Sequence, residues 1–127
     1  MTLDTRLASV VEAARSKKAF RIRLFDVTGI ASFTDTFAFM SGGSDRQNRA
    51  IAEAIEVKMK TLGERPLCTE GDATGNWILL DFGDLIVHVM DEETRRYFNL
   101  EGLWSQGREY ELPPEVLPAS PVPPSAS

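Results

Sequence analysis

The sequence predicts an α/β (α+β) fold, a single compact domain in which helices pack on a mixed sheet of five strands. Three observations predict it. The chain has 127 residues, which is enough for one domain with its own core and too few for two ordinary ones. Apolar residues recur at helical spacing in some segments and alternate in others. Residues 76–90 have the pattern of a β-hairpin, and the elements follow the order helix, two strands, helix, three strands, helix, with no internal repeat.

The N-terminal third of the chain predicts one helix and two strands. Five apolar residues share helical spacing and form one stripe: Leu3, Leu7, Val10, Val11 and Ala14. In residues 20–27, Ile22 and Leu24 alternate with other side chains, as in a strand with one face on the core. Residues 36–40 are apolar and aromatic, and therefore predict a short buried strand.

A turn at residues 41–44 opens the second helix. Ser44 and Gln47 have the spacing of a capping box, and Gly63 is expected to end the helix. Four apolar residues line one face of this helix: Ile51, Ile55, Met59 and Leu62. Residues 66–69 then predict a short edge strand, because proline is tolerated best at the edge of a sheet.

The predicted hairpin is the most informative segment. With Phe82 and Gly83 in the turn, Asp81 pairs with Asp84, and the period-two alternation separates two faces. One face is wholly apolar and is expected to lie against the two long helices: Ile78, Leu80, Leu85, Val87 and Val89. The other face is mixed: Trp77, Leu79, Asp81, Asp84, Ile86 and His88.

The mixed face is a candidate docking surface. Like charges directly opposite each other on paired strands are mildly destabilising, so folding alone gives no reason to place Asp81 beside Asp84. A basic partner would supply a reason, with Trp77 as the apolar anchor. The alternative is that the last helix covers Trp77 and Leu79 while the two aspartates cap the turn. The pattern of residues leaves both interpretations open.

The C-terminal part of the chain predicts a helix followed by a tail. Asp91 is placed to cap a last helix that runs to Phe98, and residues 100–104 close the ordered part. From Pro113 onward the composition turns to Pro, Ser and Ala, which predicts disorder. We therefore expect a folded domain over residues 1–105 and a Pro-rich, disordered tail over residues 106–127.

Composition and charge exclude several classes of protein. No apolar run approaches the roughly 20 residues that span a bilayer, and the N-terminal segment lacks the apolar block of a secretory signal. Cys68 is the single cysteine, so a disulfide within one chain is excluded. The formal net charge of -5 argues against direct nucleic-acid binding. The sequence therefore predicts a soluble, cytoplasmic protein.

No catalytic constellation emerges from the residues. Residues 42–44 precede a helix and could hold a phosphate through backbone N–H groups, but the lysine of a P-loop is missing and a capped helix start is the simpler interpretation. His88 is the single histidine, and together with Asp81 and Asp84 it makes only a weak metal-site pattern. We therefore expect no enzyme, no cofactor and no metal site.

Three blocks of the sequence together carry a resemblance to a known family. The first is DVTG at residues 26–29, which leads to Phe37. The second is SGGSDRQ at residues 41–47. The third and most specific is WILLDFGDLIVHVM at residues 77–90, followed by ETR and YFNLE. Spanning roughly residues 3 to 105, the blocks resemble the ribosomal silencing factor (Iojap-related) family; Phe20 and Arg21 depart from the acidic-led start of the family's first strand, and the tail lies outside the shared pattern.

The resemblance implies a domain related to the nucleotidyltransferase fold, without catalysis. It also implies binding to the fourteenth protein of the large ribosomal subunit, a basic protein on the subunit-joining surface, so that the small subunit cannot join and translation is repressed when nutrients are scarce. Contact with ribosomal RNA would be incidental. A homodimeric scaffold, a factor for large-subunit assembly and a nucleotidyltransferase-type enzyme remain as alternatives, and family members often form homodimers.

The resemblance and the mixed face of the hairpin together indicate where the partner binds. The expected partner-binding residues are Trp77, Leu79, Asp81, Asp84, Ile86 and His88, with Tyr97, Leu100 and Trp104 as edges. In this hypothesis Trp77 is the apolar anchor, and the two aspartates pair with Lys or Arg of the partner.

Overall fold

The computed structural model describes residues 3–71 and 74–114, and it places four helices and six strands in that part of the chain. The helices are α1 (Thr5–Ser16), α2 (Asp45–Thr61), α3 (Glu92–Phe98) and α4 (Leu100–Trp104). The strands are β1 (Phe20–Asp26), β2 (Thr36–Ser41), β3 (Cys68–Gly71), β4 (Trp77–Asp81), β5 (Leu85–Met90) and β6 (Arg108–Glu109). The predicted mixed α+β fold is confirmed, with one strand more than expected.

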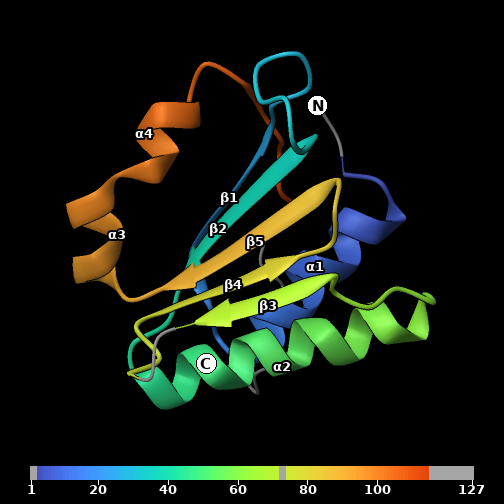
Figure 1. The fold of residues 1–127 in the computed structure, drawn as a ribbon. Helices are drawn as coiled ribbons and strands as arrows, with labels where there is room; N and C mark the ends of the chain where they lie inside the picture. The colour runs from blue at the N-terminus through green and yellow to red at the C-terminus, as the bar shows by residue number, and fades with distance from the viewer. Residues whose placement is uncertain (1–2, 72–73, 115–127) are drawn as a thin grey trace, which may run out of the picture.

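The six strands form one sheet in the order β3-β4-β5-β2-β1-β6 (Figure 1). β2 and β5 lie side by side and parallel at the centre, and the other neighbours are antiparallel. The additional strand, β6, pairs with Phe25 and Asp26 of β1. Its two residues are too few to show a period in the sequence, and they fall in the segment that the sequence assigned to the tail. The disordered tail was predicted over residues 106–127; of these, residues 115–127 lie outside the described residues.

One face of the sheet is covered by α1 and α2 (Figure 1). All five apolar hairpin residues that were predicted to face the two long helices belong to this core, so that prediction is confirmed. From the helices, Val10, Ile51, Ile55 and Met59 complete it and are fully buried. The alternation of the hairpin therefore reports correctly which side of the sheet the helices cover.

Side-chain caps fix where the helices begin. Ser44 Oγ accepts a hydrogen bond from the Gln47 backbone N–H at 3.0 Å, and the Gln47 side chain accepts one from the Gly43 N–H at 2.6 Å. Asp91 accepts from the Thr94 N–H at 2.7 Å and starts α3. Both caps were predicted from spacing, because a short polar side chain satisfies an N–H group that has no partner within the helix.

The hairpin has a different register from the predicted one. Leu79 pairs with His88 and Asp81 with Ile86, so the turn consists of Gly83 and Asp84. Gly83, with a φ of 92°, is the first of the two turn residues, where a type II′ turn needs glycine. The shift by two residues keeps the faces of both strands, but it moves Asp84 out of the sheet. The expected side-by-side pair of aspartates is therefore wrong.

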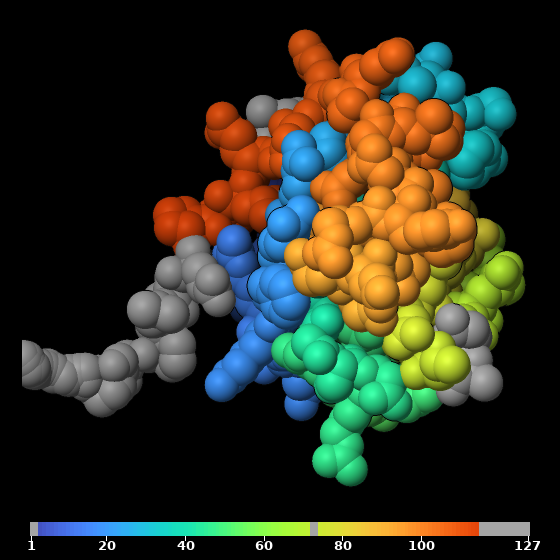
Figure 2. Space-filling model, turned by 90° about the vertical axis from the view of Figure 1, so that its left-hand side faces the viewer, coloured from blue at the N-terminus to red at the C-terminus, as the bar shows by residue number. Residues whose placement is uncertain are grey.

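The other face of the sheet carries a second, aromatic core. Phe25, Phe37 and Phe39 lie on this face together with Ile86 and Met90 of β5. Leu100 and Trp104 of α4 pack against them. Figure 2 shows α3 and α4 on this side of the molecule, with the loop between β1 and β2 beside them. Both faces of the central strands are thus covered, which explains why every residue of β2 and β5 is buried.

None of the helices in the described part of the chain is long and apolar enough to cross a membrane.

Candidate functional site

A row of aromatic rings runs across the second face of the sheet. Successive ring centroids are 4.9 to 6.0 Å apart in the order Tyr97, Phe98, Trp77, His88, Phe37, Trp104 and Phe33. The ends of the row are accessible, with Tyr97 81% and Phe33 59% exposed, whereas His88 in the middle is only 4% exposed. The row therefore links the interior of the protein to two exposed aromatic groups.

We call Trp77, Leu79, Tyr97 and Phe98 the aromatic patch. Phe98 is half-exposed and its ring lies 4.9 Å from the ring of Trp77, while Tyr97 extends beyond it. Contiguous large apolar side chains at a surface mark binding sites more often than isolated ones do. Leu103 of α4, 65% exposed, adds a further apolar side chain to the same helical pair. The patch can dock a partner, because its side chains gain burial that folding does not provide.

A groove lies next to the patch, between Trp77 and Leu79 on β4 and residues 69–71 on β3. Its volume is about 700 Å³. Glu70 pairs with Leu79 across the two strands, so its carboxylate belongs to the same side of the sheet as the patch. The groove thus combines an apolar base with an acidic rim, which suits an apolar anchor flanked by a basic group.

His88 is buried and contacts Trp77, a residue of the aromatic patch. Its Nδ1 accepts a hydrogen bond from the Trp77 indole N–H at 3.0 Å, and its ring stacks on Phe39 with centroids 5.1 Å apart. Burial lowers the pKa of His88 to about 4, so the imidazole is neutral at pH 7 and carries its proton on Nε2. The hydrogen bond fixes the orientation of the Trp77 ring. His88 therefore positions the anchor and does not itself reach the surface.

The two aspartates of the predicted surface are separated in the structure. Asp81 Oδ1 accepts a hydrogen bond from the Gly83 N–H at 2.8 Å and caps the turn. Asp84 lies in the turn and pairs with Arg6 of α1 at 2.7 Å. The interpretation in which the aspartates serve the turn is supported for Asp81. Asp84 contacts the helix on the opposite side of the sheet and lies apart from the patch.

The remaining residues that were predicted to bind the partner differ in how deeply they are buried. Trp77, Leu79 and Tyr97 come together in the aromatic patch. Leu100 and Trp104 are partly buried against the aromatic core, and Ile86 is buried within that core. Three exposed apolar residues of this surface were not predicted: Phe98, Leu103 and Phe33. Phe98 directly follows Tyr97, and two adjacent aromatics in a short helix cannot both face its core; this signal was available. Phe33 had none, because its loop shows no period.

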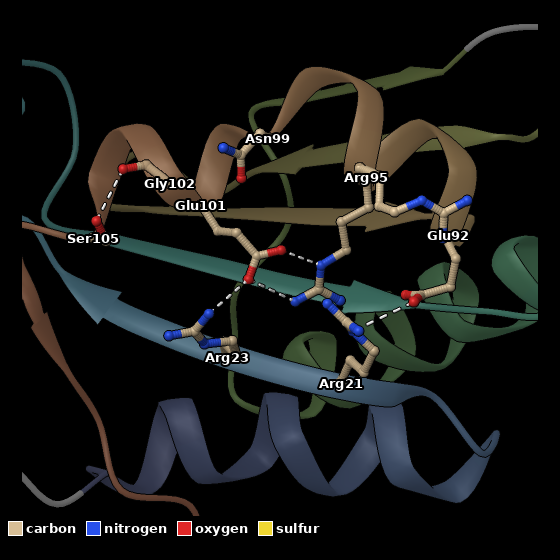
Figure 3. A pocket seen from close by; sticks show the side chains of 9 residues that line it. Arg21, Arg23, Glu92, Arg95, Asn99, Glu101, Gly102 and Ser105 are labelled. Carbon is tan, nitrogen blue, oxygen red and sulfur yellow. Dashed lines mark hydrogen bonds and ion pairs between the residues drawn. The ribbon is translucent and has the colours of Figure 1, made fainter.

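A buried ion-pair network holds α3 and α4 on the sheet (Figure 3). Arg95 donates to both carboxylate oxygens of Glu101, at 2.5 and 3.2 Å, and to Ser41 Oγ at 2.8 Å. Arg23 of β1 reaches the same carboxylate at 3.1 Å. Burial alone would raise the pKa of Glu101, but the hydrogen bonds and charges of Arg95 and Arg23 outweigh it and lower that pKa. The helix pair that carries Tyr97 and Phe98 is therefore fixed before any partner binds.

Clustered metal ligands and a reactive thiol are the groups that metal binding and covalent chemistry would need. Within ranges 3–71 and 74–114, no three His, Cys, Asp or Glu side chains gather as metal ligands. Cys68 is exposed, and its hydrogen bond to Glu70 raises the pKa of the thiol, which keeps it protonated. What the arrangement offers is an apolar surface with an acidic rim on a fixed support.

Comparison with known proteins identifies the family. The family model described as "Ribosomal silencing factor during starvation" matches residues 2–126. The chain belongs to this family. The ribosomal silencing factor RsfS of Bacillus subtilis is 38% identical over 104 residues, which cover 82% of this chain and 88% of that protein.

The fold of the ribosomal silencing factor family is also known from solved structures. A crystal structure of a protein from Chromobacterium violaceum superposes with a TM-score of 0.75 at 30% identity and covers 93% of this chain and 97% of that one. A more distant relative, the mouse protein named "Mitochondrial assembly of ribosomal large subunit protein 1", is 32% identical over 100 residues; these are 76% of this chain and 43% of the mouse protein. The family domain thus also occurs inside a longer chain.

Proposed function

We propose that this chain binds the large ribosomal subunit through the subunit's fourteenth protein, blocks joining of the small subunit and thereby represses translation. The action is steric, so it requires a docking surface and no catalytic step. Membership of the ribosomal silencing factor family supports a role at the ribosome. The name of the mouse relative, which refers to the large subunit, supports that subunit as the partner.

The observation that carries the proposal is the exposed aromatic patch on α3, next to the groove on β4. Aromatic anchors provide much of the binding energy of protein interfaces, especially where a pocket lies beside them. Tyr97 and Phe98 project from a helix that the Arg95–Glu101 pair fixes to the sheet. A fixed surface loses little conformational entropy when it binds, which favours affinity.

Charge supports a basic partner. The chain carries a formal net charge of -5, and Glu70 and Asp81 lie on β3 and β4 on the side of the patch. Acidic groups around an apolar centre raise the rate of association with a basic protein and select against acidic ones. A basic protein on the joining surface of the large subunit has the complementary charge.

Sedimentation tests the proposal. We would mix the purified chain with isolated large subunits, with small subunits, and with both, and measure where the chain and the joined ribosomes migrate. We expect co-migration with large subunits alone and fewer joined ribosomes. Tyr97→Ala should weaken the co-migration about tenfold or more. Val57→Ala, which removes a side chain of 59% exposure on the opposite side of the sheet, is the matched control.

Absence of the chain from large-subunit fractions at modest salt would overturn the proposal.

A homodimeric scaffold is the alternative that the same surface allows, because an apolar patch can also bind a second copy. In that case Tyr97→Ala would abolish self-association in analytical ultracentrifugation and leave the migration of subunits unchanged. An assembly role would appear as binding to immature large subunits without an effect on subunit joining.

A further inference from the structure

A second cavity lies away from the aromatic patch, between β1 and the helix pair α3–α4 (Figure 3). Its volume is about 230 Å³, and it opens to solvent. Six charged side chains line it: Arg21, Arg23, Arg95, Arg96, Glu92 and Glu101. Four arginines against two glutamates give this cavity a formal charge of +2, in a chain whose net charge is -5. The lining of the cavity is therefore positively charged, although the protein as a whole is negatively charged.

Two of the arginines have guanidinium donors that no contact among the described residues uses. The other two, Arg95 and Arg23, bind the Glu101 carboxylate. Arg96 makes no hydrogen bond or ion pair with any residue that the structure describes. Arg21 touches Glu92 through Nε alone, at 3.4 Å, and its side chain is 58% exposed. Two residues that line the cavity thus keep unused guanidinium donors.

An irregularity in the backbone of β1 accompanies the position of Arg21 in the lining of the cavity. The pairing of β1 with β2 shifts between Phe20 and Arg23, and Arg21 has a φ of 53°, which L-residues rarely adopt. Bulges of this kind re-aim side chains and are frequent beside functional sites. As a result Arg21 and Arg23 line one cavity together with two helices that follow much later in the chain.

The cavity also has the position and the donors of an oxyanion site. Ser41, which ends β2, accepts a hydrogen bond from Arg95, and Glu92 lies two residues after the end of β5, so the cavity lies near the carboxyl ends of the two parallel strands. Ligands of α/β sheets bind at that end. The side-chain amide of Asn99, a neutral donor, is also in its lining. The Glu101 carboxylate, held by two arginines, shows that this environment stabilises an oxyanion.

We propose that this cavity binds a phosphate group. Planar guanidinium groups match the oxygens of phosphate in a bidentate manner, and Arg96 and Arg21 supply them. The cavity is smaller than pockets that enclose whole ligands, which begin at about 300 Å³, so the rest of the phosphate-bearing molecule lies outside it. Both a nucleotide and the backbone of an RNA strand present such a group.

Titration with phosphate-bearing probes tests the site in the absence of ribosomes. We would add inorganic phosphate, adenosine monophosphate and a short single-stranded RNA separately to the full chain, and follow the backbone amide signals by NMR and the affinity by calorimetry. We expect signals of residues around the cavity to shift in at least one titration. Stronger binding of the monophosphate than of the RNA would indicate a nucleotide, and the reverse would indicate an RNA backbone.

Two variants decide whether the arginines are responsible. Arg21→Gln with Arg96→Gln should weaken binding about tenfold or more, because charge-assisted hydrogen bonds are lost, while the spectrum stays that of a folded protein. Arg46→Gln changes an exposed arginine of α2 outside the cavity and should leave the affinity unchanged. No shift around the cavity with any probe, or equal weakening by Arg46→Gln, would overturn the proposal. Either result would leave docking through the aromatic patch untouched.

Discussion

The hydrogen bond between Trp77 and His88 determines how the aromatic patch is presented. Trp77 is polar only at its indole N–H, and the buried imidazole satisfies that group at 3.0 Å. In the absence of this acceptor the indole would have to turn its N–H toward water, which would rotate the ring away from Phe98. A single buried acceptor thus keeps the largest side chain of the patch in one orientation.

The protonation of His88 should make the stability of the protein depend on pH. The folded-state pKa of His88, about 4, lies below the 6.5 of an exposed histidine, so the folded protein binds fewer protons at this site than the unfolded chain. Its contribution is fully present above about pH 6.5 and is lost as the pH falls toward 4; it amounts to about 3 kcal/mol at most. Urea unfolding of the parent and of His88→Gln at several pH values measures this contribution.

The comparison with His88→Gln isolates the histidine from the carboxylates, which titrate in both proteins. We expect the free energy of unfolding of the parent to fall more steeply than that of the variant between about pH 6.5 and 4. Parallel curves for the two proteins would show that His88 is not buried in its neutral form.

At the scale of elements, one ion-pair network ties α3 and α4 to the sheet in addition to the apolar packing of α4. Each helix is short, and among the residues that the structure describes their buried charged groups are Arg95 and Glu101. Burying such a pair costs desolvation, and the cost is offset here by contacts to Ser41 and Arg23. The network fixes where the helices lie on the sheet, and so it fixes the aromatic patch.

Breaking this network should destabilise the protein strongly. Arg95→Met leaves the Glu101 carboxylate without its main partner and should lower the free energy of unfolding by about 3 kcal/mol or more. Guanidinium unfolding followed by circular dichroism measures the loss. Adding Glu101→Leu to Arg95→Met removes the unpaired charge and should restore part of the stability. A cost no larger than that of an exposed ion pair such as Arg49–Asp45 would contradict this role.

The elements also show what the sequence could and could not predict. The faces of the hairpin were correct because they depend only on whether a position is odd or even, and an error of two residues in the turn preserves that. Asp84 was misplaced because its position depends on the turn itself. Ile86 and His88 were expected at the surface, and both are buried. Ile86 belongs to the core on which α4 packs, and His88 lies against the rings of Phe37, Phe39 and Trp77. That burial comes from tertiary contacts, which alternation within one hairpin cannot report.

On the scale of the whole molecule, the two faces of the sheet differ in how completely their side chains are buried. One face buries its apolar residues against α1 and α2, and this side accounts for most of the core. The other face carries a smaller aromatic core beneath α3 and α4, with accessible rings at its border. Family membership and the resemblance of three sequence blocks agree on this fold. The aromatic patch was predicted from the sequence for Trp77, Leu79 and Tyr97, and not for Phe98.

The measurement that tests the central claim most directly is the affinity of the chain for the isolated fourteenth protein of the large subunit, by calorimetry. We expect binding that the double variant Tyr97→Ala, Phe98→Ala weakens about a hundredfold, because two aromatic contacts are lost, and that Val57→Ala leaves unchanged. Circular dichroism confirms that each variant is folded. An undiminished affinity of the double variant would contradict the claim that the aromatic patch is the docking surface.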